Sequence, residues 1–159
     1  MLMHTQSNLD PGNCWQTCVA CVLEIDPATM PAQEVFEWKR TREDGSIEWG
    51  PSYQTPLNAF LRKHHGLTYG ELYEHQWPAV MPRDPGFHFL IGPTVRTPTS
   101  GCKHVVVARY GEMVWDVHPS RAGLTMIERW GVLAPFPEGW ARTWNEIPCV
   151  CPACATEAA

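Results

Sequence analysis

The feature that most constrains the fold is a change in hydrophobic periodicity along the chain. In the first 65 residues, apolar side chains recur at helical spacing in the segments 14–25 and 56–65. Beyond residue 86 they form short runs rich in Val, Ile, Phe and Trp, which read FHFLIG, HVVVARY, MVWDV and LTMIERWGVL. Because helices precede strands and do not alternate with them, this order predicts an α+β fold with an antiparallel sheet.

The first predicted helix, over residues 14–25, is bounded by turn signals. The sequence DPGN precedes it, and Asn13 is a competent N-cap. The pair Asp26-Pro27 ends it, because the residue before a proline is pushed out of the helical region. Two more helices are predicted over residues 32–40 and 56–65, the latter stopped by Gly66, and residues 77–86 are predicted to form a loop punctuated by prolines.

Composition narrows the class of protein. The 159 residues suit one domain, which we place at 1–147, and the Cys-rich segment 148–159 looks like a separate tail. The formal charge of −5 and the scattered Lys and Arg residues argue against a nucleic-acid partner. Neither an apolar leader nor a run of about 18 apolar residues is present, so we expect no membrane partner and a cytoplasmic location.

Three cysteines, Cys14, Cys18 and Cys21, share the first predicted helix at a spacing that could hold an iron–sulfur cluster. A helix rises 1.5 Å per residue and would spread their sulfurs over ~10 Å, too far for one cluster. Cys18 lies a turn inside the helix, which does not fit a redox pair at a helix N-terminus. We therefore predict that Cys18 and Cys21 are buried core residues.

Cys14 differs because it lies in the first turn of this helix. The helix dipole and the unpaired N–H groups there favour an anion, which would lower the pKa of the thiol from ~8.5. The same N–H groups can stabilise an oxyanion. Cys14 is therefore the candidate nucleophile.

A nucleophilic thiol needs a base, and seven histidines compete for that role. His104 opens the most apolar predicted strand, and Asp116 ends the next strand after a short hairpin through Gly111. We predict that Asp116 orients the His104 imidazole, with His118 as the alternative base. The other histidines have structural explanations: His64 and His65 end a helix, His75 lies in a loop, and His88 is predicted on a half-exposed strand face.

The motifs around these residues resemble a known family. The segment GNCW at 12–15 resembles the start of the nucleophile helix in papain-like cysteine peptidases, and the order Cys, His, Asp suits their C39-like branch. The blocks GPTVR at 92–96, HVVV at 104–107 and DVHPSRAGL at 116–124 resemble small bacterial and phage proteins of that class.

The resemblance implies a papain-like fold in which the nucleophile helix packs on a C-terminal antiparallel sheet. It implies Cys14 as nucleophile, His104 as general base and then acid, and Asp116 as orienting group. Family members also use a Gln before the nucleophile as an oxyanion donor, which here would be Gln6 at a slightly longer distance along the chain. The interval of 90 residues between Cys14 and His104 is shorter than is common in papain-like enzymes.

Taken together, these features predict a thiol hydrolase, a cysteine peptidase, isopeptidase or amidase that acts on a peptide, protein or amide substrate through an acyl-enzyme. Trp15, Asn13 and Arg96 are the predicted substrate-binding residues. The alternative on the same scaffold is a binding module without turnover, which would use the pocket around Trp15 and the GPTVR loop for recognition.

A further alternative is a zinc-binding protein, because Cys149, Cys151 and Cys154 lie close together in the sequence PCVCPAC. Cys102 or a histidine would have to complete four ligands. Only three of these cysteines are local, so we favour a flexible tail with exposed thiols and expect no cofactor. Any zinc held there is expected to be structural and separate from Cys14.

Overall fold

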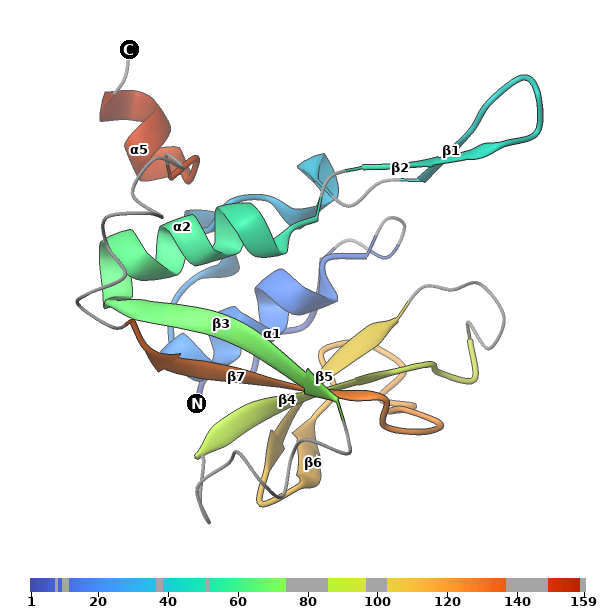
Figure 1. Ribbon diagram of the computed structural model, residues 1–159. Coiled ribbons are helices and arrows are strands. Elements are labelled where there is room, and N and C mark those ends of the chain that lie inside the picture. The colour runs from blue at the N-terminus through green and yellow to red at the C-terminus, as the bar shows by residue number, and fades with distance from the viewer. Residues whose placement is uncertain are drawn as a thin grey trace.

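The computed structural model describes residues 1–7, 9, 12–36, 39–50, 52–73, 86–96, 103–136 and 149–157. A five-stranded antiparallel sheet lies against helix α1 (Cys14–Leu23). Helix α2 (Gln54–His65) runs along strand β3 (Leu67–Tyr73) of this sheet, and the C-terminal helix α5 (Pro152–Glu157) lies near one end of α2 (Figure 1). The α+β class and the antiparallel sheet are therefore confirmed. Nearly all of the predicted loop 77–86, the histidine at position 75 and the proposed domain boundary at 147 lie outside the described residues.

The sheet has the strand order β3-β7-β4-β5-β6, and neighbouring strands all pair antiparallel. Its strands are β3 (Leu67–Tyr73), β4 (Phe87–Gly92), β5 (His104–Arg109), β6 (Glu112–Trp115) and β7 (Arg129–Pro135). β4 and β5 are almost wholly buried, as their continuous apolar runs require. β7 begins only at Arg129, so the predicted strand over 124–133 was placed too early, and β3 was not predicted.

The hairpin between β5 and β6 brings the start of one strand near the end of the next. Tyr110 and Gly111 form its turn with φ of 54° and 83°, values that suit a tight hairpin with a glycine at the second position. The Gly111 N–H also donates to Nε2 of His88, which is fully buried and stacks on Trp130. The prediction of a half-exposed His88 is wrong, because β4 is an inner strand covered on both faces.

Helix α1 (Cys14–Leu23) starts where the sequence predicts and ends two residues early. Glu24 adopts a left-handed conformation with φ of 58° and closes the helix, whereas Asp26 caps the following 3-10 turn η1 (Pro27–Thr29). The Asn13 side chain does not cap α1; its Nδ2 donates to Ser7 Oγ. One face of α1 lies against β5, where the Cys18 thiol donates to the Val105 carbonyl.

The helix predicted over residues 32–40 is wrong. The chain instead forms the 3-10 turn η2 (Gln33–Val35) and then the hairpin of β1 (Lys39–Thr41) with β2 (Ile47–Trp49). The turn between these strands explains the outcome: Gly45 has a φ of 81°, and Asp44 accepts hydrogen bonds from the Ser46 backbone and hydroxyl. These local turn interactions favour a hairpin over the weak helical pattern.

Helix α2 (Gln54–His65) confirms the third predicted helix, and Gly66 ends it in the left-handed conformation. The short helix α5 (Pro152–Glu157) contacts η1. Cys151 is fully buried and Cys154 is 8% exposed, so the expectation of exposed thiols is wrong for both. None of the helices in the described part of the chain is long and apolar enough to cross a membrane.

Candidate functional site

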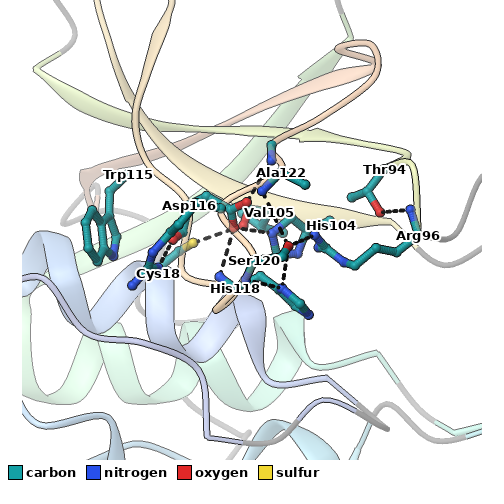
Figure 2. A network of polar contacts seen from close by, with 12 residues as sticks. Cys18, Thr94, Arg96, His104, Val105, Trp115, Asp116, His118, Ser120 and Ala122 are labelled. Atoms are coloured by element: carbon teal, nitrogen blue, oxygen red, sulfur yellow. Dashed lines mark hydrogen bonds and ion pairs between the residues drawn. The ribbon is translucent and has the colours of Figure 1, made fainter.

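The structure brings His104 and Asp116 together in a buried ion pair. His104 is the first residue of β5, Asp116 directly follows β6, and the hairpin places them opposite one another. His104 Nε2 lies 2.7 Å from Asp116 Oδ1, and only 7% and 3% of the two residues is exposed (Figure 2). The predicted orienting contact is therefore present between these two side chains.

Backbone amides fix the Asp116 carboxylate. Oδ1 also accepts from the His118 N–H at 2.8 Å, and Oδ2 accepts from the Gly123 N–H at 2.8 Å. Burial alone would raise the pKa of Asp116, but the hydrogen bonds from His104 and from these two amides outweigh burial and lower the pKa to about 2. Asp116 is thus held as a carboxylate in one orientation.

Cys14 is the second partner of His104. Because Asp116 occupies Nε2, the ring nitrogen left for the thiol is Nδ1. Burial lowers the pKa of His104, but its hydrogen bonds with Asp116 and with Cys14 outweigh burial and raise the pKa to about 9. The raised pKa makes the imidazole a strong proton acceptor, and it lies between the Asp116 carboxylate and Cys14.

The N-terminal end of α1 shapes the surroundings of Cys14. Gln33 Oε1 accepts from the N–H groups of Trp15 and Gln16 at 3.0 and 3.1 Å, so a side chain from η2 caps the helix. In the described part of the chain, no acceptor is found for the Cys14 N–H. That N–H is the helix donor available to an oxyanion.

The three cysteines of α1 separate as the sequence predicts. Cys14 is 8% exposed, whereas Cys18 and Cys21 have no exposed surface. Burial raises the pKa of the Cys18 thiol well above its ordinary value and also raises that of Cys21. Both are neutral core residues, which confirms their predicted role.

Gln6 lies on an N-terminal segment that runs beside the Asp116 loop. Its N–H donates to the Val117 carbonyl at 2.9 Å, and the indole of Trp115 donates to the His4 carbonyl at 2.8 Å. Gln6 is 6% exposed. The segment is thus anchored to the residues flanking Asp116.

His118, the alternative base, has other partners. Its Nδ1 accepts from the Ser120 N–H and faces the Ser120 hydroxyl at 2.9 Å. Its ring is perpendicular to that of His104, with 6.1 Å between centroids (Figure 2). Burial and the nearby Arg96 guanidinium lower the pKa of His118. Asp116 pairs with the His104 side chain and with only the backbone of His118, which favours His104 as the base.

The three predicted substrate-binding residues have different surroundings. Arg96 is exposed and donates to Ser120 Oγ at 2.6 Å, which places it beside His118 at the edge of the site (Figure 2). Asn13 is buried. Trp15 is half-buried and packs edge-on against Tyr69 with 5.3 Å between ring centroids. Arg96 is therefore the one charged residue of the three, and its side chain is exposed beside His118.

A cavity of about 650 Å³, here called the α1 cavity, lies beside the helix. Asn13, which precedes α1, and Gln16 and Thr17 of α1 line it, together with Val150 and Pro152 from the C-terminal segment. Neither Cys14 nor His104 is among its lining residues. It is therefore distinct from the surroundings of the Cys14–His104 contact.

A second group of chemically reactive side chains lies at the end of α2. His64 Nε2 and the sulfurs of Cys149, Cys151 and Cys154 all lie within 4.8 Å of one another, and we call these four residues the C-terminal cysteine cluster. The group could bind a metal ion. Burial raises the pKa of Cys149 to about 12, and a hydrogen bond from Lys63 lowers that of Cys154 to about 6.

Sequence reasoning missed two functional contributions. His64 was interpreted as an exposed helix-end residue, although a histidine was anticipated as a fourth ligand; Cys102, the other candidate, lies outside the described residues. The signal for His64 would have been its place in the last turn of a predicted helix. The Gly123 amide was also missed, although the glycine forms part of the DVHPSRAGL block.

Comparison with known proteins found no matching family model, no similar curated protein and no similar solved structure.

Proposed function

We propose that this protein is a thiol hydrolase that uses Cys14 as nucleophile, His104 as general base and acid, and Asp116 as the orienting group. The observation that carries the proposal is the buried His104–Asp116 contact of 2.7 Å, to which Cys14 is added as a further cause of the raised pKa of His104. The three residues come from α1, β5 and the loop after β6, so only the folded chain unites them. Such an arrangement of thiol, imidazole and carboxylate is the general pattern of an activated nucleophile.

The chemistry follows from these contacts. The proton of the Cys14 thiol passes to His104 Nδ1, and the thiolate attacks the substrate carbonyl carbon to form a C–S bond. The imidazolium then protonates the leaving amine as the C–N bond breaks, which leaves a thioester. A water molecule gives a proton to His104 and attacks the thioester. The C–S bond then breaks to release the acid, and His104 returns the proton to the Cys14 sulfur to restore the thiol.

The oxyanion formed in both steps needs hydrogen-bond donors. We assign this role to the Cys14 N–H and to the side chain of Gln6. The Cys14 amide is at the positive end of α1, and Gln6 lies on the segment tied to Val117 next to Asp116. Gln6 would supply its amide NH2 group.

The arrangement also supports a papain-like fold as the finer description of this α+β chain. Its nucleophile helix packs on the strand that carries the histidine, and the acid directly follows the next strand. The substrate class proposed is a peptide, isopeptide or simple amide. A catalytically inactive binding module on the same scaffold would keep this geometry without turnover.

An active-site thiol probe tests the proposal. Native protein should be labelled at Cys14, and labelling should fall strongly in Cys14→Ala, whereas Cys21→Ala, which removes a fully buried thiol from the same helix, should label like the wild type. Labelling that is no lower in Cys14→Ala than in the wild type would refute the nucleophile assignment. Cys14-dependent hydrolysis of any amide substrate would exclude the inactive binding module.

We propose metal binding as a second function, favoured by the convergence of the C-terminal cysteine cluster within 4.8 Å. The bound ion would be a structural zinc, separate from the hydrolase, because none of the four residues contacts Cys14, His104 or Asp116 in the contacts described. Elemental analysis of the purified full chain tests this function. One equivalent of metal is expected, and absence of bound metal after zinc supplementation would refute it.

A further inference from the structure

We infer that zinc at the C-terminal cysteine cluster is bound by all four side chains and acts as a clasp, tying residues 149–154 to helix α2 and so fixing one wall of the α1 cavity. This inference rests on the proposed metal-binding function and specifies its ligands and its structural role.

Four of the six separations within the cluster are close to those expected around a tetrahedral ion. With Zn–S of about 2.3 Å and Zn–N of about 2.0–2.1 Å, the edges of a tetrahedron are about 3.8 Å between sulfurs and about 3.6 Å between sulfur and nitrogen. His64 Nε2 lies 3.9, 3.5 and 3.4 Å from the sulfurs of Cys149, Cys151 and Cys154. The sulfurs of Cys151 and Cys154 are 3.4 Å apart, which is no disulfide bond.

The chemical types of the four donor atoms favour zinc over other common metal ions. Three sulfurs and one imidazole nitrogen suit zinc, whereas magnesium and calcium prefer oxygen ligands. Four protein ligands also leave no open position, so the site is closed and structural rather than catalytic.

The surroundings support this donor set. The His64 ring packs against Phe60, one turn earlier on α2, with 5.0 Å between centroids, which limits its rotation. Lys63 Nζ lies 3.1 Å from the Cys154 sulfur. A zinc ion with three thiolates and a neutral imidazole carries one net negative charge, and the Lys63 ammonium offsets it.

The position of the cluster assigns it a mechanical role. His64 belongs to the last turn of α2, and the three cysteines come from a segment more than 80 residues later. Val150 and Pro152 alternate with the ligands Cys149 and Cys151 along that segment, and both line the α1 cavity, as do Asn13, Gln16 and Thr17. An ion that holds the ligands therefore also holds this part of the cavity wall.

The experiment uses the full chain, purified under reducing conditions, with zinc replaced by Co²⁺. The expected spectrum shows the intense absorption of tetrahedral cobalt and thiolate-to-cobalt charge transfer. His64→Asn and Cys149→Ser should lose stoichiometric metal after dialysis against a chelator, and Cys149→Ser spares the buried Cys151. His65→Asn, the matched control at the neighbouring position, should retain metal.

Two failures are distinguishable. If the wild-type chain binds no metal, the metal-binding function and the clasp both fall. If it binds one equivalent but lacks thiolate charge transfer, or if His64→Asn retains metal as well as His65→Asn does, metal binding stands and the clasp is refuted.

The mechanical role is tested separately by hydrogen exchange. Metal removal should increase exchange across residues 149–157. Unchanged exchange there would overturn the assignment of the ion as a clasp.

Discussion

At the scale of single residues, the carboxylate of Asp116 governs the state of His104. Asp116→Asn removes the charge and keeps the shape, so the pKa of His104 should fall from about 9 toward its ordinary value of 6.5. Turnover of an amide substrate should drop by roughly 10²- to 10⁴-fold. NMR titration of the His104 ring measures the first effect. Asp44→Asn, in the exposed β1–β2 turn, is the control and should leave both quantities unchanged.

The His104–Asp116 pair makes the free energy of unfolding depend on pH. The pKa of His104 is raised in the folded state, so its stabilising contribution is complete below about pH 6.5 and is lost as the pH rises through about 9. The pKa of Asp116 is lowered, so its contribution is present above about pH 4 and is lost as the pH falls through about 2. Urea unfolding of wild type and Asp116→Asn should therefore differ most between pH 4 and 6.5. A difference that grows from pH 7 to pH 9 would contradict this assignment.

The choice between two histidines is also testable. His104→Gln should abolish the reactivity of Cys14, whereas His118→Gln should change it by less than about tenfold. The reason is that the His118 side chain is hydrogen-bonded to Ser120, whereas the Asp116 carboxylate is paired with the His104 side chain. Rates of thiol labelling compare the two variants. A larger loss in His118→Gln would mean that His118 is the base.

At the scale of elements, the start of α1 depends on a residue from another segment. Gln33→Ala would leave the N–H groups of Trp15 and Gln16 without their acceptor and should lower the free energy of unfolding by about 0.5–2 kcal/mol. It should also slow labelling of Cys14, whose position that cap fixes. Gln54→Ala, on α2, provides a control for loss of a glutamine. Equal stability of Gln33→Ala and the wild type would show that α1 needs no such cap.

The end of β4 requires a glycine for steric reasons. A Cβ at Gly92 would lie 2.0 Å from the Met126 carbonyl oxygen, and backbone cannot move aside as a flexible side chain can. Gly92→Ala should therefore lower the free energy of unfolding by about 3 kcal/mol. A Cβ at Gly70, in β3, would meet no atom within 4 Å, so Gly70→Ala should be tolerated. Denaturant unfolding compares the two variants. Equal stability of Gly92→Ala and Gly70→Ala would contradict the close approach of Gly92 to the Met126 carbonyl.

At the scale of the whole molecule, the zinc clasp would join the first half of the chain to its C-terminal end. Chelation of the metal should lower the melting temperature by about 10 °C, since a ligand at about 1,000 times its Kd contributes about 4 kcal/mol. Calorimetry with and without a chelator measures the shift. His64→Asn should show the lower value with or without the chelator, and a chelator effect that persists in this variant would place the metal elsewhere.

Sequence patterns predicted the parts of the fold that local signals determine. The start of α1, the stop of α2 at Gly66 and the hairpin at Gly111 follow from capping and turn residues. The hairpin in turn allowed the His104–Asp116 contact to be predicted, because it places two strand ends opposite each other.

The remaining features depend on contacts that are distant in sequence. Gln33 accepts hydrogen bonds from N–H groups of α1 that are 17 and 18 residues away in the sequence. The segment around Gln33 forms a 3-10 turn and not the helix that its weak pattern predicts. His64 meets cysteines more than 80 residues later, and His88 is buried because β7 and β5 flank its strand. No periodicity within a single segment encodes such contacts.

The most direct test of the central claim is the rate of Cys14 alkylation at neutral pH, followed by mass spectrometry of the Cys14 peptide. If His104 activates the thiol, Cys14 in the wild type is alkylated at least tenfold faster than in His104→Ala, on the order of the effect of a general base. Equal rates in the two proteins would contradict the proposal that His104 activates Cys14.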